Sequence, residues 1–118
     1  MILVDTSVWI EHFRRENKPL GSLLLAGQVA CHEFVIGELA CGQLRQRSEI
    51  LYYLSNLPQA TTASHEDALT LIEQRRLFGA GLGWIDVHLL AATVMDGLRL
   101  WTADAALATA AKKIGVAA

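Results

Sequence analysis

Apolar residues form two kinds of pattern along the chain, short unbroken runs and longer stretches with apolar positions three and four residues apart. The short runs are typical of buried strands, and we expect strands at residues 1–4, 28–31, 60–63 and 98–102. The longer stretches are typical of helices that pack one face on a sheet. We expect these helices at residues 5–13, 20–26, 34–44, 50–57, 64–78, 85–95 and 105–114.

Strands and helices alternate along the chain, which favours a parallel sheet covered by helices on both faces. We therefore predict an α/β fold with three layers, α/β/α, around a central parallel sheet of about four or five short strands. No Pro/Gly/Ser-rich linker interrupts the sequence, so we expect residues 1–118 to form a single domain. The 53% content of hydrophobic residues is enough for a core that needs neither a disulfide nor a structural zinc ion.

The net charge of −2 argues against a protein that coats nucleic acid through a general positive charge, because such domains carry a large excess of Lys and Arg. Any contact with nucleic acid must therefore be local. Basic residues do occur close together, as at Arg14 and Arg15 or at Arg45 and Arg47, although such pairs are more often solvated helix faces.

The cysteines and the apolar runs indicate the cellular compartment of the protein. Cys31 and Cys41 lie in no zinc-binding spacing, and we expect them to be free thiols that pack as small apolar residues in a reducing cytosol. Asp5 interrupts the apolar start of the chain, so we expect no signal peptide. No apolar run approaches the ~20 residues of a membrane span. We therefore expect a cytoplasmic protein with no membrane partner.

Four acidic residues stand at unusual places in this pattern. Asp5 and Asp104 each follow a predicted strand, and ligands of open parallel sheets bind beyond the carboxyl ends of the strands. Asp86 lies in the first turn of an almost wholly apolar helix, and Glu38 lies within a mostly apolar one. We hypothesise that these four side chains meet at one crevice.

Each acid also has a structural explanation. Asp is a preferred N-cap, so Asp5, Asp86 and Asp104 could each begin a helix, and Glu38 could pair with Arg45 or reach solvent. Taken together, the acids favour a site for a divalent cation, because no matching basic residues stand nearby in the sequence. Two carboxylates ~4 Å apart repel by about 4 kcal/mol at an effective dielectric constant of 20, and a divalent cation removes that cost.

The types of candidate ligand indicate which ion would bind. Carboxylates with water suit Mg²⁺ or Mn²⁺, whereas zinc prefers His and Cys. The four histidines are scattered and form no ligand set, so we expect surface residues or core residues with satisfied hydrogen bonds. These histidines are His12, His32, His65 and His88.

Four segments that contain the acids, residues 4–10, 38–42, 84–92 and 100–107, resemble in the usual order the acidic motifs of the PIN-domain superfamily. The resemblance implies a PIN-like fold and a Mg²⁺- or Mn²⁺-dependent endoribonuclease that hydrolyses RNA phosphodiester bonds. The catalytic and metal-binding residues would be Asp5, Glu38, Asp86 and Asp104. Ser7 and Thr102 match hydroxyl positions that support these acids. No acid closely follows Asp104, which leaves the number of metal ions open.

Short, stand-alone chains of this superfamily are mostly VapC-type toxins of type II toxin-antitoxin pairs. The resemblance therefore implies a growth-inhibiting toxin that cuts transfer RNA or ribosomal RNA, forms a homodimer and is neutralised by a cognate antitoxin. Such an antitoxin wraps around a groove and places a basic side chain near the acids. Leucines of residues 20–26, together with Tyr52 and Tyr53, could line this groove or could complete the core.

Other functions are compatible with parts of the pattern. A phosphatase of the haloacid-dehalogenase type needs a second Asp two residues after the first, where this chain has Ser7. A receiver domain needs adjacent acids after the first strand and a Lys near the end of the last, and neither is present. The alternative that stays open is a PIN-fold binding partner in a DNA-binding regulatory complex, with weak or no nuclease activity.

Overall fold

Three short parallel strands form the centre of the computed structural model, which describes residues 1–118. The strands are β1 (Ile2–Val4), β2 (Val29–Ala30) and β3 (Arg99–Trp101), and their order in the sheet is β2-β1-β3. Both neighbours of β1 run parallel to it. The α/β fold with a parallel sheet is thus confirmed, and β1 is its central strand.

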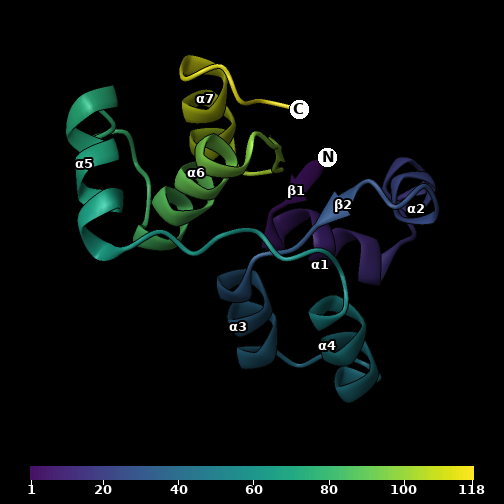
Figure 1. Ribbon diagram of the computed structural model, residues 1–118. Helices are drawn as coiled ribbons and strands as arrows, with labels where there is room; N and C mark the ends of the chain where they lie inside the picture. The colour runs from purple at the N-terminus through teal and green to yellow at the C-terminus, as the bar shows by residue number, and fades with distance from the viewer.

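Seven helices surround the strands. They are α1 (Thr6–Arg14), α2 (Lys18–Leu25), α3 (Glu33–Cys41), α4 (Arg47–Ser55), α5 (His65–Arg75), α6 (Trp84–Asp96) and α7 (Ala105–Lys113). Figure 1 shows α5 and α6 to the left of the strands, α7 above α6, and α3 with α4 below the strands. None of the helices combines the length and the apolar character that a bilayer crossing requires.

The expected count of four or five strands was too high. Residues 60–63 form no strand, and the segment touches the sheet only at an isolated bridge between Gln59 and Cys31. Two residues of this segment instead form hydrogen bonds with side chains outside the sheet. Thr61 donates from its backbone and its hydroxyl to Asp96, and the neighbouring Thr62 hydroxyl donates to Glu33.

Capping residues explain where the helices begin and end. The Asn17 side chain accepts a hydrogen bond from Leu20 N, so α2 begins earlier than its apolar pattern predicted. The Ser64 cap of α5 is confirmed, but this helix ends at Arg75 because Arg76 has a left-handed conformation with φ of 52°. The remaining differences are shifts of a few residues at the ends of elements.

The hydrophobic core is one cluster of 23 buried residues, and β1 and α6 lie at its centre. Leu3 and Val4 of β1 are completely buried, and α6 is buried from Val87 to Thr93. Since Asp5 follows β1 directly and Asp86 lies in the first turn of α6, two of the four acids are attached to well-buried elements of the fold.

The cysteines are both free, as expected, but only one of them is packed in the core. Cys31 is buried, and this burial raises the pKa of its thiol to about 11. Cys41 is exposed at the end of α3, so the expectation that it packs as an apolar residue was wrong.

Two histidines also differ from the expectation that the ring nitrogens of core histidines would all have hydrogen-bond partners. His32 and His88 are buried, and neither Nε2 of His32 nor Nδ1 of His88 has a hydrogen-bond partner. The His88 ring packs edge-on against Phe34 and Trp84, each at 4.8 Å between ring centroids. Burial lowers the pKa of both imidazoles, because a charged ring would lose its hydration.

We expect the fold to lose stability as the pH falls below 6.5, the ordinary pKa of histidine. Because the pKa of His32 and His88 is lowered in the folded chain, these imidazoles take up protons more readily in the unfolded chain, so protons favour unfolding. Replacing His88→Phe keeps the ring contacts and removes one titrating group. Between about pH 7 and about pH 5 its melting temperature should fall less than that of the parent. If the melting temperatures of His88→Phe and the parent fall equally over this pH range, this explanation is contradicted.

Candidate functional site

Asp5 is a buried carboxylate held by two hydroxyl groups. It lies between the end of β1 and the start of α1, and its backbone N–H donates to Trp101 O of the neighbouring strand at 2.9 Å. The Ser7 and Thr102 hydroxyls both donate to its Oδ2 atom at 2.7 Å. Only 6% of the residue is exposed, and no basic side chain forms a salt bridge with it. Both hydroxyls bind Oδ2, and the Oδ1 atom of Asp5 accepts no hydrogen bond.

The same two hydroxyls connect the ends of β1 and β3. The Ser7 hydroxyl accepts from the N–H of Ala103, and the Thr102 hydroxyl accepts from the N–H of Asp104, each at 3.0 Å. The hydroxyl oxygens lie 3.3 Å apart. Because each hydroxyl has one proton, which it donates to Asp5, this separation is a contact and not a further hydrogen bond. The strand ends are thus fixed relative to the buried carboxylate.

Asp104 lies on the other side of this network and begins α7. Its Oδ2 atom accepts from Leu107 N at 2.9 Å, so the capping role considered from the sequence is present. The residue is exposed, and its Oδ1 atom accepts no hydrogen bond.

Asp86 is the third residue of α6 and is partly buried. Its Oδ2 atom accepts a hydrogen bond from the N–H of Gly83 at 2.9 Å. Gly83 is the residue just before α6, and this bond gives its backbone N–H a partner. Burial raises the pKa of Asp86, the Gly83 N–H opposes this shift, and the negative charges of Asp5 and Asp104 raise the pKa further. Asp5 and Asp104 are therefore close enough to Asp86 for their charges to act on it.

Glu38 reaches the site from α3, which packs against α1. Its Oε1 atom accepts from the Thr6 hydroxyl at 2.7 Å, and Thr6 is the residue next to Asp5. No ion pair joins Glu38 to Arg45, the alternative considered from the sequence. Thr6 itself was not recognised as a site residue, because a contact between residues 32 positions apart leaves no local signal in the sequence.

The four acids thus share one feature: a hydrogen bond holds one carboxylate oxygen, and the other oxygen has no partner within the chain. No group of three His, Cys, Asp or Glu side chains is compact enough to hold one ion as the residues stand. Repulsion between like charges and the local hydrogen bonds account for the spacing. The free atoms are all carboxylate oxygens, which fit Mg²⁺ or Mn²⁺ and do not suit zinc.

Comparisons with known proteins show which family the chain matches. A family model described as PIN domain matches residues 2–113, a range that includes all four acids. The chain is also similar to Ribonuclease VapC32 of Mycobacterium tuberculosis, in strain CDC 1551 / Oshkosh and in strain ATCC 25618 / H37Rv. Each relative is 47% identical over 118 residues, which is 99% of this chain and 95% of the relative.

We expect Thr102→Val to destabilise the metal-free protein, because it removes a donor to Asp5 and the acceptor of the Asp104 N–H without changing the side-chain shape. The expected loss in the free energy of unfolding is about 1–3 kcal/mol, measured by urea denaturation. Thr109→Val is the matched control, since Thr109 is exposed on α7 and makes no side-chain hydrogen bond. An equal loss in both variants would show that the hydroxyl does not hold the carboxylate.

Proposed function

Since the chain belongs to the PIN-domain family and is homologous over nearly its full length to a VapC ribonuclease, we propose that it is a metal-dependent endoribonuclease acting as a growth-inhibiting toxin. Its catalytic and metal-binding residues are Asp5, Glu38, Asp86 and Asp104, and its cofactor is Mg²⁺ or Mn²⁺. The observation that carries this proposal is the buried Asp5 carboxylate, which has no basic partner and has other carboxylates around it. A bound dication would balance these charges.

The residues of the chain prepare the site for phosphodiester hydrolysis. When bound, the ion supplies positive charge for the phosphate oxygens and lowers the pKa of a coordinated water. Ser7 and Thr102 hold one oxygen of Asp5, so its other oxygen keeps a fixed direction. Thr6 does the same for Glu38. The unpaired carboxylate oxygens are acceptors that can orient a water toward phosphorus and receive its proton.

The proposed partners are an RNA substrate, transfer RNA or ribosomal RNA, a cognate antitoxin and a second copy of the chain in a homodimer. The sequence left open whether Tyr52 and Tyr53 complete the core, and their exposed fractions of 73% and 43% argue against that. Tyr53 lines an apolar groove between α1, α2 and α4, together with Leu24 and Ile50. A groove of this kind suits the apolar face of an antitoxin segment.

We expect Asp5→Asn to abolish RNA cleavage in the presence of Mg²⁺ or Mn²⁺ and to relieve growth arrest on expression. An amide keeps the shape but loses the charge that binds the ion, and the rate should fall by at least about a hundredfold. Asp67→Asn is the control, because Asp67 is exposed on α5 and outside the site. If the parent protein leaves cellular RNA intact in the presence of either metal, the alternative of a binding module replaces this proposal.

Metal binding should also be visible without any RNA. Mg²⁺ or Mn²⁺ should raise the melting temperature of the parent protein, because an ion that binds only the folded state adds about 2.7 kcal/mol at a hundred times its Kd. Asp5→Asn should show little of this rise, and Asp67→Asn should show all of it. The same shift in all three proteins would place the ion elsewhere.

A further inference from the structure

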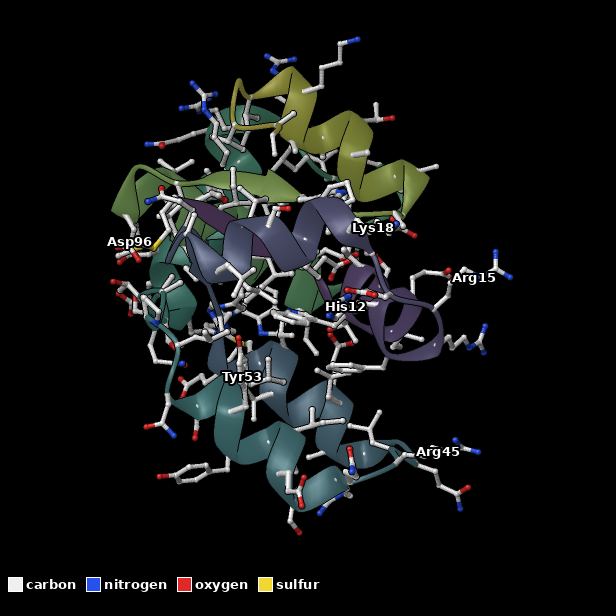
Figure 2. All side chains as sticks on the ribbon, turned by 90° about the vertical axis from the view of Figure 1, so that its right-hand side faces the viewer. His12, Arg15, Lys18, Arg45, Tyr53 and Asp96 are labelled. Carbon is white, nitrogen blue, oxygen red and sulfur yellow. The ribbon has the colours of Figure 1, made fainter.

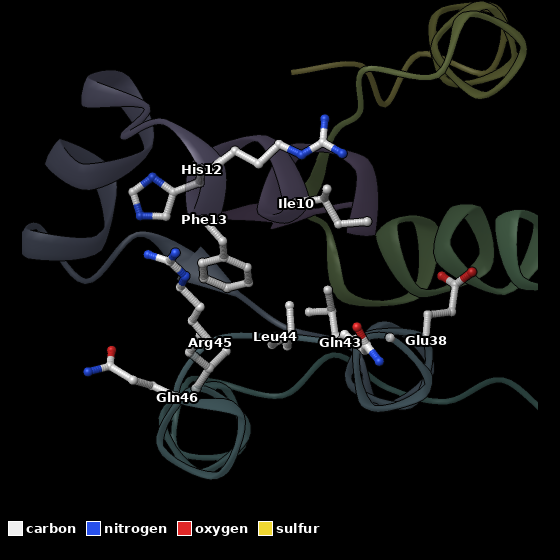
Figure 3. Close-up of a pocket in the computed structure, with 12 residues that line it drawn as sticks. Ile10, His12, Phe13, Glu38, Gln43, Leu44, Arg45 and Gln46 are labelled. Carbon is white, nitrogen blue, oxygen red and sulfur yellow. The ribbon is translucent and has the colours of Figure 1, made fainter.

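A groove runs along the molecule from the acidic site, between α1 and the segment that joins α3 to α4. Figure 3 shows Glu38 at one end of this groove and His12, Arg45 and Gln46 at the other. Glu38 belongs to the proposed catalytic set. A ligand that fills the Glu38 end of the groove would therefore lie at the site of the proposed reaction. We call this surface the Glu38 groove.

The middle of the Glu38 groove is apolar. Ile10 and Phe13 from α1 and Leu44 from the α3–α4 segment lie between its two ends in Figure 3. Phe13 is half-buried and stacks on Trp9 with 5.8 Å between the ring centroids, so this wall is fixed by the core. A rigid apolar surface of this kind is suited to the faces of unpaired bases.

The charges along the Glu38 groove favour a polyanion. Its lining includes Arg14, Arg45 and His12, and Glu38 is its only acid. Arg47 and Arg99 are engaged with backbone carbonyls, but the guanidinium groups of Arg14 and Arg45 donate to no other residue of the chain. In Figure 2 the Arg45 side chain extends away from the ribbon into solvent. Two free guanidinium groups in a chain of net charge −2 form a local site for anions.

We propose that the Glu38 groove binds the single-stranded stretch of the RNA substrate next to the cleaved bond, with Arg14 and Arg45 bound to its phosphates. This inference rests on the proposed function, because it places the cleaved bond at the Glu38 end. Guanidinium groups at the edges of an apolar wall match phosphates and bases of one strand. A protein partner would fit better in the neighbouring groove that contains Tyr53, because the lining of that groove includes Glu49 and no Lys or Arg.

The test measures RNA binding separately from cleavage. In an Asp86→Asn background, a fluorescein-labelled single-stranded oligoribonucleotide of mixed sequence is titrated in Mg²⁺ buffer and followed by anisotropy. Adding Arg14→Gln or Arg45→Gln should raise the Kd about tenfold each. Each substitution should also reduce the slope of log Kd against log salt by about 0.7, the value for one phosphate contact on a single strand.

Matched variants separate phosphate binding from a structural effect. Arg75→Gln removes an exposed arginine of α5 that does not line the groove, and it should leave both the Kd and the salt slope unchanged. Arg14→Lys and Arg45→Lys should recover most of the affinity, because lysine keeps the charge. Thermal melting identifies any variant that has lost its fold.

A second readout uses the exposed thiol of Cys41, which directly precedes Gly42 of the groove lining. Bound RNA should slow the reaction of Cys41 with a maleimide several-fold, and the protection should disappear in the Arg14→Gln/Arg45→Gln double variant. Cys31 does not interfere, because it is buried and its thiol pKa is about 11.

The outcomes distinguish this inference from the proposed function. If the parent protein cleaves RNA but the arginine variants bind RNA as Arg75→Gln does, the groove proposal is overturned and the surface is available to a protein partner. If the arginine variants bind weakly but the parent protein cleaves no RNA with either metal, the groove proposal stands for RNA binding and the nuclease proposal fails.

Discussion

The arrangement of the site depends on one buried negative charge, the Asp5 carboxylate at the end of the central strand. Removing a carboxylate from water costs several kcal/mol even after the surroundings relax. The Ser7 and Thr102 hydroxyls offset part of this cost, and they also fix the ends of β1 and β3. They add no positive charge, and Asp86 and Asp104 add further negative charge. The metal-free fold therefore keeps an electrostatic cost that a bound dication would reduce.

The acids form no compact cluster, because a local hydrogen bond holds each of them where it stands. Helix-start hydrogen bonds hold Asp86 and Asp104, and the Thr6 hydroxyl holds Glu38. Each of these bonds uses one oxygen and leaves the other free. Asp104 can therefore cap α7 and also act as the proposed metal ligand, because the cap uses Oδ2 and leaves Oδ1 free. Asp5 differs, since its side chain caps no helix although it lies at the cap position of α1.

The sequence allowed the main elements and the place of the acids to be predicted because both follow from local patterns. An unbroken apolar run before Asp5 gave β1, and the apolar character of α6 placed Asp86 at the start of a buried helix. Apart from the shifted helix ends, two errors came from contacts between distant residues. Residues 60–63 have the composition of a strand, but Asp96 and Glu33, from two other elements, bind the neighbouring threonines. The unsatisfied nitrogens of His32 and His88 likewise depend on packing that no local pattern records.

The Glu38 groove and the apolar groove that contains Tyr53 are not independent surfaces. Both are lined by His12, Phe13, Gln46 and Ile50, so they meet along α1 and the start of α4. A partner bound in the apolar groove would contact residues that also line the path proposed for RNA, and the two ligands would compete for them. Inhibition by an antitoxin would then need no change in the acids themselves, because the antitoxin would cover residues of the proposed RNA path.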